Sequence, residues 1–511
     1  MRFFKKLIGI SLVLFCLVSQ AQAQAQINPN AFGYYQDVLR FSQYTQYGSA
    51  RQFGLAGAGT TLGADVTSTL LNPAGLGFYN RNQVTFTPNL TFNNYTTQFN
   101  GTTTDEQQDL FGFASFGAVI NFNKSDLIPG GWRGGTLGVT YNRLSDFKQT
   151  LNYSGFNGES SIIDAMLDNA FDLAPFELGG LEQAGYDHYL INPFPDDPRV
   201  YTSFVDGFPN QLEKISRKGH MDQINVSVGG NYDDKIYVGA GIGFVSSRYT
   251  FERVYTEDFE NSQLSTFTMD ERLSIQGNGV NANLGVILRP TQFFRIGASV
   301  TTPTWFTFSE ESDIFYTSVY NDYDVSQFLD ENGNRIIEED TILGTLQTNT
   351  PLFVSDYELR TPFKYNLGSS IVVGKIGFIT ADVEYMDYSN AKITSNDFNE
   401  SADNETISNI YQNTMNARLG AEIRLSVLRF RAGAAYIGNP YKDSYDSTDR
   451  SQMIYSAGFG VYSRSFFADL GLSTTTFQSN YQSYSFFDGS GPVATTETQS
   501  LQGRLTLGFN F

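Results

Sequence analysis

The sequence has little of what several common protein classes depend on. Its 511 residues include one cysteine, which excludes a disulfide-stabilised scaffold, and only two histidines. The 33 bases are outnumbered by 53 acids, so the positive surface that nucleic-acid binding needs is missing. No stretch after residue 25 approaches the roughly 18 apolar residues of a membrane-spanning helix. Aromatic residues are abundant instead: 44 Phe and 30 Tyr exclude a disordered chain, which has few aromatics.

The first 25 residues have the pattern of a secretory signal peptide. Arg2, Lys5 and Lys6 give a positive start, and residues 7–18 form an apolar stretch that is too short to span a membrane. Small residues that suit cleavage follow at Ala21, Ala23 and Ala25. The exported protein is therefore predicted to be periplasmic, secreted or an outer-membrane barrel. Cleavage also removes the only cysteine, Cys16.

Most of the remaining chain alternates apolar and polar residues in short segments. Near the C-terminus the apolar side chains fall on odd positions: Leu501, Leu505, Leu507, Phe509 and Phe511. This period of two, ending on an aromatic, is expected of a closing barrel strand, although a soluble sandwich can also alternate. Alternation and turn residues together predict fourteen strands. They lie near 82–99, 110–122, 134–152, 219–233, 235–255, 266–289, 292–311, 351–373, 375–392, 409–426, 428–440, 451–463, 465–480 and 496–511.

The connections between these strands differ in length on the two sides. Tight turns are predicted at 233–235, 289–291, 374, 426–427 and 463–464, and longer links at 153–218, 256–265, 312–350, 393–408, 441–450 and 481–495. Short turns on one side and long loops on the other are the layout of an outer-membrane barrel. We therefore predict an all-β fold: a 14-stranded antiparallel transmembrane β-barrel over 82–511, with long extracellular loops at 153–218 and 312–350.

Six charged residues of the predicted strands lie on the face opposite the apolar one. They are Arg418, Glu422, Arg424, Arg429, Arg431 and Arg504. An arginine that faces lipid at mid-membrane costs about 2–4 kcal/mol, so these side chains are predicted to line the lumen. There they either support the barrel interior or contribute to ligand binding.

Residues 26–81 do not alternate like strands. Apolar side chains stand near helical spacing over 31–44, and a run of small residues at 54–59 is followed by Asn72-Pro73-Ala74-Gly75. Small residues let backbones pass closely, and a proline interrupts a regular helix. A compact, irregular segment of this kind could cap the barrel or fold inside it.

This segment resembles the N-terminal hatch of a known family. Residues 49–59, 64–69 and 72–76 are similar to the hatch of the FadL/TodX family, outer-membrane transporters of long-chain fatty acids and other hydrophobic compounds. The resemblance covers essentially the whole exported chain and is strongest at 48–80. A fourteen-stranded barrel is also the family's fold.

The resemblance implies a plugged barrel with a defined route for its ligand. Residues 26–81 would form the hatch, with Asn72, Pro73, Ala74 and Gly75 as its hinge turn. A ligand would collect on an apolar groove among the outer loops and move to a pocket beside the hatch. A shift of the hatch would then release it sideways through a gap in the wall.

Residues 160–171, within the loop 153–218, form a predicted amphipathic helix. Its apolar face carries Ile162, Ile163, Met166, Leu167 and Phe171. The helix could supply one wall of a capture groove for apolar ligands, or it could pack down on the barrel mouth as a lid.

Two further features are interpreted without assigning chemistry to them. Residues 310–340 hold ten acids and one base, and the stretch from Asp330 begins like a calcium loop. However, Arg335 stands where such loops need glycine, and Thr341 stands where they need an acid. A solvated acidic loop and no metal site are therefore predicted. Neither histidine lies near a nucleophile motif, so we predict no enzyme and no cofactor.

The sequence therefore predicts an outer-membrane protein of a Gram-negative bacterium that passes hydrophobic, fatty-acid-like molecules inward without ATP. Its predicted partners are the hydrophobic small molecule, outer-membrane lipid and lipopolysaccharide. The alternative is a barrel of the same fold that serves as an accessory subunit of an outer-membrane secretion or assembly complex. In that case the gap in the wall would dock a protein partner.

Overall fold

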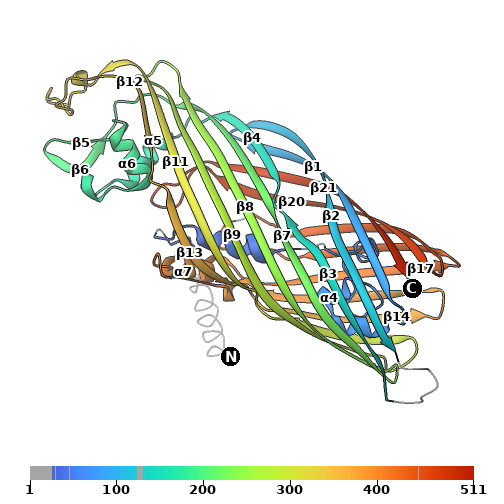
Figure 1. The fold of residues 1–511 in the computed structure, drawn as a ribbon. Helices are drawn as coiled ribbons and strands as arrows, with labels where there is room; N and C mark the ends of the chain where they lie inside the picture. The colour runs from blue at the N-terminus through green and yellow to red at the C-terminus, as the bar shows by residue number, and fades with distance from the viewer. Residues whose placement is uncertain (1–25, 29, 45–46, 124–130, 447) are drawn as a thin grey trace, which may run out of the picture.

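The described chain forms a closed β-barrel (Figure 1). The computed structural model describes residues 26–28, 30–44, 47–123, 131–446 and 448–511, so the predicted signal peptide lies outside the described residues. Fourteen antiparallel positions, here termed staves, make up the wall. The ring closes because β1 (Gln83–Phe99) pairs with β21 (Val493–Asn510). The predicted fold class and strand number are confirmed.

Ten staves of the described wall are single strands and four are interrupted. Besides β1 and β21, the single strands are β2 (Thr102–Asn123), β7 (Pro209–Tyr232), β8 (Ile236–Phe259), β9 (Leu264–Leu288), β17 (Asn413–Leu425), β18 (Leu428–Ile437), β19 (Gln452–Tyr462) and β20 (Phe466–Gln482). The interrupted staves are β3 (Trp132–Asp146) with β4 (Gln149–Phe156), β10 (Phe294–Thr301) with β11 (Trp305–Asp324), β12 (Ile342–Asn349) with β13 (Phe353–Arg360) and β14 (Lys364–Val373), and β15 (Gly377–Asp387) with β16 (Lys392–Ser395).

The two ends of the barrel differ as predicted. At one end, here termed the turn end, tight turns at 233–235, 289–293, 374–376, 426–427 and 463–465 join the strands. At the loop end, long strands and their connections project beyond the rest of the wall (Figure 1). β7, β8 and β9 have 24, 24 and 25 residues. At about 3.3 Å per residue each of these strands is roughly 80 Å long. A strand of about 9–11 residues is enough to cross a membrane, so these strands are far longer than a crossing requires.

The longest predicted loops contain more strand than expected. β11 continues to Asp324 and β12 pairs with it, so the predicted loop 312–350 is a strand hairpin closed by 325–341. Five of the acids assigned to a solvated loop, Glu310 to Asp324, therefore lie on a strand. Likewise, β7 begins at Pro209 within the predicted loop 153–218. These stretches pair outside the lipid-facing belt, where exterior residues are polar and the apolar alternation used for prediction fades.

The outer face of the wall changes from apolar to charged along the barrel, and the inner face changes from small residues to large aromatic ones. On β8, Ile242 and Phe244 are exposed on the outside near the turn end, whereas Arg248 and Glu252 are exposed farther along the same face. Inward, the same strand carries glycines first and the buried Tyr249 later. An apolar outer band belongs in lipid and a polar one in water. The turn-end half is therefore the membrane-level section, and the loop-end half stands above the membrane.

Short helices and a hairpin cover the loop end. They are α5 (Ile162–Asn169), η3 (Pro175–Glu177), α6 (Gly180–Asp187), the β5 (Asn192–Phe194) and β6 (Asp197–Thr202) hairpin, η4 (Val325–Gln327) and α7 (Ser401–Ile410). By contrast, η5 (Tyr388–Asn390) lies within the wall, between β15 and β16. Figure 1 shows α5, α6, β5 and β6 together at this end, away from the C-terminus. None of the helices that the structure describes is long and apolar enough to cross a membrane.

The N-terminal part of the chain lies inside the barrel. Its elements are η1 (Tyr34–Gln36), α2 (Asp37–Ser42), α3 (Ala50–Phe53), α4 (Ser68–Leu71) and η2 (Pro73–Phe78). The helix predicted near 31–44 is thus present as η1 and α2. Residues 48–80, here termed the luminal segment, contact inward-facing positions from β2 around to β20. The lumen of the membrane-level section is filled by protein.

Candidate functional site: the barrel lumen

The Asn-Pro-Ala turn is held against the wall by its own asparagine. Asn72 precedes η2, and its side-chain oxygen accepts a hydrogen bond from the backbone N–H of Ala74 at 3.1 Å. Its amide nitrogen donates to the carbonyl of Thr60 at 2.8 Å, across the luminal segment. Asn72 is almost fully buried. One side chain therefore closes the turn and ties it to the preceding loop.

Glycines of the wall make room for this turn. A Cβ at Gly285 would overlap the side chain of Asn72, and one at Gly239 would overlap the backbone of Pro73. At Gly229 a Cβ would lie 2.7 Å from the Pro73 carbonyl oxygen. These glycines stand on the adjacent strands β7, β8 and β9, so the turn lies directly on the wall backbone. A glycine in a strand commonly marks such a close approach.

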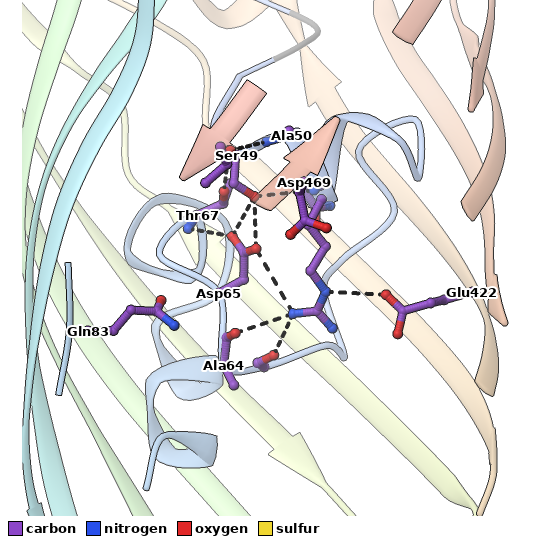
Figure 2. Close-up of polar contacts among 12 residues, drawn as sticks. Ser49, Ala50, Ala64, Asp65, Thr67, Gln83, Glu422 and Asp469 are labelled. Atoms are coloured by element: carbon purple, nitrogen blue, oxygen red, sulfur yellow. Dashed lines mark hydrogen bonds and ion pairs between the residues drawn. The ribbon is translucent and has the colours of Figure 1, made fainter. Parts of the chain in front are cut away.

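Arg51 links the luminal segment to the wall near the turn end (Figure 2). Its guanidinium lies 3.7 Å from Glu422 and 4.0 Å from Asp65, and it donates to the carbonyl of Gly63 at 3.1 Å. Asp65 in turn accepts hydrogen bonds from the Ser49 hydroxyl. The sequence patterns did not single out Arg51, although it is the only base between Arg40 and Arg81.

Four of the six predicted lumen charges form ion pairs on the inner face. Glu422 pairs with Arg424 and with Arg431, each at 2.7 Å, and Arg431 also pairs with Asp469 at 2.6 Å. Arg418 pairs with Glu384 at 3.0 Å. A buried ion pair is costly to form but much costlier to break, so these groups hold the wall and the luminal segment in one arrangement.

The two remaining predicted charges contact backbone and rings. Arg504 donates to the carbonyl of Gly48 at 3.1 Å and lies over the ring of Phe53. Arg429 donates to the carbonyl of Ser426 in the adjoining turn at 2.7 Å. All six thus point inward, and four of them help to anchor the luminal segment or its surroundings. They fit the structural interpretation of the lumen charges.

A cavity of about 330 Å³ lies between the luminal segment and the turn end. Its wall combines apolar and charged side chains, namely Leu62, Val66, Phe78, Phe378 and Phe467 with Arg51, Arg295, Glu422, Arg424 and Asp469, among others. The cavity adjoins the ion pairs described above. It provides room next to the luminal segment in which that segment can shift.

Above the membrane-level section the lumen holds a large apolar cluster, next to buried charges such as Arg253, which pairs with Glu213 and Glu271. This part, here termed the upper chamber, is lined by Tyr95, Phe99, Tyr153, Ile215, Tyr249, Ile275, Phe306, Phe308, Tyr357, Leu359, Ile407 and Tyr411, among others. The side chains come from strands around the whole ring and from α7. A closed apolar lining inside a solvent-facing wall can shelter a hydrophobic molecule from water.

The N-terminal helix occupies the upper chamber in this structure. Phe41 stacks on Phe308 with 4.4 Å between ring centroids, and Val38 is fully buried. α7 fixes the start of the helix, because the buried carboxylate of Asp403 accepts the backbone N–H groups of Phe32 at 2.9 Å and Gly33 at 3.1 Å. Sequence patterns did not reveal this contact, since 371 residues separate its partners.

The predicted groove residues of α5 form a packed core instead. Ile162, Ile163 and Met166 are buried against β8, β9 and β11, Leu167 is partly buried, and Phe171 is exposed. The wall of an open capture groove, as one interpretation had it, is not formed by these buried side chains. A ligand-binding role for these residues stays a prediction.

A buried carboxylate fastens α5 to the wall above the membrane. Glu257 of β8 accepts hydrogen bonds from the backbone N–H of Ile162 at 2.9 Å, from Gln211 at 2.7 Å and from the Tyr255 hydroxyl at 2.6 Å. Burial raises the pKa of Glu257 to about 7. The carboxyl is therefore partly protonated near neutral pH.

Asp330 of the acidic loop and the histidine His188 both have local structural roles. Asp330 accepts backbone N–H groups of Asn332 and Asn334 in its own turn. His188 is buried at the loop end, and its ring nitrogens lie 2.8 Å from the hydroxyls of Ser318 and Thr348. Burial lowers the pKa of His188, so the ring is neutral and held in place.

Comparison with known proteins finds solved structures that share the fold of this chain but have low sequence identity to it. No family model matches the chain, and no curated relative matches it. A solved FadL homologue from Pseudomonas aeruginosa covers 92% of this chain and 99% of its own, with 14% identity and a TM-score of 0.55. The toluene transporter TodX of P. putida covers 92% and 99%, with 11% identity and a TM-score of 0.51. This chain has the FadL fold.

The FadL fold and the belt of exposed apolar side chains agree on where the protein resides. Single-chain barrels with an even number of antiparallel strands and an outer apolar band are bacterial outer-membrane proteins. The protein is therefore an outer-membrane barrel. Within the FadL fold, this chain combines a protein-filled, polar lumen at membrane level with an apolar chamber above it.

Proposed function

We propose that the protein is a passive outer-membrane channel for hydrophobic small molecules of the long-chain, fatty-acid-like class. One observation carries the proposal: a cluster of buried aromatic and aliphatic side chains lines the lumen where the outer wall faces water, whereas ion pairs and the luminal segment fill the lumen where the outer wall faces lipid. Each methylene that leaves water for such a chamber gains about 0.8 kcal/mol. The chamber can therefore collect a hydrophobic solute above the membrane.

The route onward is sideways into the bilayer. Straight ahead, a hydrophobic molecule would meet the Arg51 contacts and the Glu422–Arg431–Asp469 cluster. Disrupting buried ion pairs costs several kcal/mol, and they offer an apolar chain nothing in return. The lipid tails, by contrast, are as apolar as the chamber itself. Lateral release therefore avoids both the charged lumen and the periplasmic water.

In this proposal residues 26–81 act as the hatch, and the turn Asn72-Pro73-Ala74-Gly75 acts as its hinge. The helix over Asp37–Ser42 must give way before a ligand can enter the upper chamber. The cavity near the turn end leaves room for such a shift. In this proposal uptake is driven only by the concentration gradient of the ligand.

The protein purified from its native membrane in mild detergent tests this proposal against the alternative. We expect mass spectrometry of the extract to detect hydrophobic small molecules bound to the protein, and the purified sample to contain no second protein in equal amount. A stoichiometric protein partner without any bound hydrophobic molecule would instead identify an accessory subunit of a secretion or assembly complex.

A further inference from the structure

The cavity of about 330 Å³ beneath the luminal segment is bounded by residues that lie next to the tight turns. Arg295 lies just beyond the turn 289–293, and Arg424 and Arg429 flank the turn 426–427. In outer-membrane barrels the short turns face the periplasm. The side chains of Arg424 and Arg429 are only half-buried, so the cavity is in contact with the water at the turn end.

Arginines outnumber acids around this cavity. Its charged lining consists of Arg51 from the luminal segment and of Asp65, Arg295, Glu422, Arg424, Arg429 and Asp469. The acids already have partners, because Glu422 alone is shared by Arg51, Arg424 and Arg431. Asp469 pairs with Arg431, which is not part of the lining. The lining therefore carries positive charge that the described residues do not compensate.

Arg295 has no acidic partner in the described part of the chain. Its buried Nε finds no hydrogen-bond acceptor there, and its guanidinium lies over the ring of Phe78, 4.5 Å from the centroid. Arg51, Arg289 and Arg424 act on it as neighbouring like charges. A half-buried charge without a counter-charge costs free energy, and an anion in the cavity would offset that cost.

Aromatic rings of the lining hold three of these arginines by their faces. The pairs, with the distance from guanidinium carbon to ring centroid, are Arg295 and Phe78 at 4.5 Å, Arg424 and Phe378 at 5.5 Å, and Arg429 and Tyr462 at 5.2 Å. Stacking uses the face of the guanidinium and leaves its N–H edge available. Such an edge fits a carboxylate or a phosphate through two parallel hydrogen bonds.

Most donors of these three arginines are available to a ligand. Within the described chain Arg424 donates only from Nε, to Glu422 at 2.7 Å. Arg429 donates from a single terminal nitrogen, to the backbone carbonyls of Ser426 and Leu428. The other nitrogens of both residues and those of Arg295 can therefore bind an oxyanion.

Apolar side chains line another part of the same cavity. They are Leu62, Val66, Phe78, Val372, Phe378 and Phe467. The volume lies at the lower end of the roughly 300–1,000 Å³ that is typical of small-molecule sites, and a mineral anion would fill only part of it. An amphiphilic anion fits both parts of the lining, with its oxyanion at the arginines and its apolar body at these side chains.

Bases also gather around the turn end itself, although the whole chain has 33 bases against 53 acids. The turns and strand ends described there carry Arg81, Arg133, Lys235, Arg289, Lys375 and Arg464. Their acids are Asp233 and Asp234, which pair with Arg133 and Lys235. The other four bases leave this rim positive, and a positive rim raises the local concentration of anions.

We infer that the cavity at the turn end is a binding site for a small amphiphilic anion, a phosphate or carboxylate on a short apolar body, taken from the periplasmic water. Arg295, Arg424 and Arg429 bind the oxyanion. The bound anion fills the room into which the luminal segment can shift and adds a contact to Arg51 of that segment. The site is separate from the upper chamber, so the inference holds whether or not the protein takes up hydrophobic molecules.

Isothermal titration calorimetry of the full exported chain in a non-ionic detergent tests this inference. The probe is phenyl phosphate, and phenol is its uncharged counterpart with the same apolar body. Arg295→Gln removes one cation without breaking an ion pair, and Arg429→Gln is a second variant in case the first does not fold. Lys375→Gln is the matched control, because it removes the same charge from an exposed turn position outside the lining.

We expect phenyl phosphate to bind in equal stoichiometry, phenol to show no binding, and Arg295→Gln to weaken phenyl phosphate binding at least about tenfold, as for a lost hydrogen bond to a charged group. Arg429→Gln is expected to weaken binding and Lys375→Gln to leave it unchanged. No binding of phenyl phosphate, or equal binding of phenol, would overturn the inference. Equal weakening by Arg295→Gln and Lys375→Gln would show attraction to the positive rim without a site.

Titration of the protein in phosphatidylcholine nanodiscs, with and without phosphatidylglycerol, distinguishes a soluble ligand from a lipid head group. We expect phenyl phosphate to bind in both kinds of disc. Loss of binding only where phosphatidylglycerol is present would mean that a lipid head group occupies the cavity, contrary to the inference. None of these measurements depends on uptake, so their failure would leave the proposed function untouched.

Discussion

Replacement of Arg431 by methionine is expected to lower the free energy of unfolding by about 3–5 kcal/mol, the cost of removing one member of a buried ion cluster. The Arg431 side chain is fully buried between Glu422 and Asp469, at 2.7 and 2.6 Å, and also contacts the Tyr462 hydroxyl at 3.2 Å. Without it, two buried carboxylates, Glu422 on β17 and Asp469 on β20, lose their shared partner. Denaturant unfolding of the barrel in lipid vesicles measures the change.

Arg429→Met is the matched control for this prediction. Arg429 lies two residues away on the same strand and also faces the lumen, but its guanidinium donates to backbone carbonyls near the turn and has no acid partner among the described residues. We expect it to change stability by less than about 1 kcal/mol, as for other half-exposed charges. Equal losses in both variants would show that the cluster does not hold the wall together.

Gly239→Ala is expected to displace the Asn-Pro-Ala turn and make the barrel leak. The added methyl group would overlap the Pro73 backbone, and neither β8 nor the turn can move without disturbing the other. Overpacking of this kind costs about 1–3 kcal/mol, which the luminal segment can relieve by shifting off the wall. We expect faster entry of small hydrophilic solutes, measured by swelling of vesicles that contain the protein.

Gly135→Ala on β3, which is separated from β8 by β7, serves as the comparison. A Cβ there would lie 3.7 Å from its nearest neighbour, the carbonyl oxygen of Gly229, which is an ordinary contact. This variant is expected to remain as tight as the unmodified protein. If Gly239→Ala folded and remained equally tight, the turn would not be seated on the wall in the way that the glycines indicate.

Much of the barrel could be predicted because its membrane-level strands obey one strong rule. Each of them must turn apolar residues to lipid and polar residues to the lumen, so β17, β18 and β21 show a clear period of two. The same rule assigns Arg418, Glu422 and Arg431 to the inner face, where they form buried ion pairs. The tight turns at the turn end also make the connections predictable, because short turns and long loops alternate along the chain.

Beyond the belt the rule no longer applies, and prediction lost accuracy there. On β11 and β13 the outer face is polar and the inner face is apolar, which is the reverse of the membrane-level pattern. The sequence pattern consequently predicts a loop where β11 pairs with β12. For α5, amphipathicity reveals an apolar face without revealing what covers it.

The contacts that define the lumen join residues far apart in the chain, and local patterns do not encode them. Asp403 meets the start of the N-terminal helix, and Arg51 meets Glu422, only because the barrel closes around them. Two of the breaks in the wall do have a local signal, however. Pro303, between β10 and β11, and Pro362, between β13 and β14, each lie within a stretch that otherwise alternates like a strand, and proline there commonly marks a break.

The central claim is that the protein passes hydrophobic molecules while its filled lumen excludes hydrophilic ones. The most direct test compares the initial uptake rates of 1-N-phenylnaphthylamine and of sucrose in Gram-negative cells with and without the protein. We expect the protein to raise uptake of the hydrophobic probe at least about tenfold and to leave sucrose entry unchanged, since apolar transfer favours only the former. Equal acceleration of both solutes, or of neither, would contradict this account.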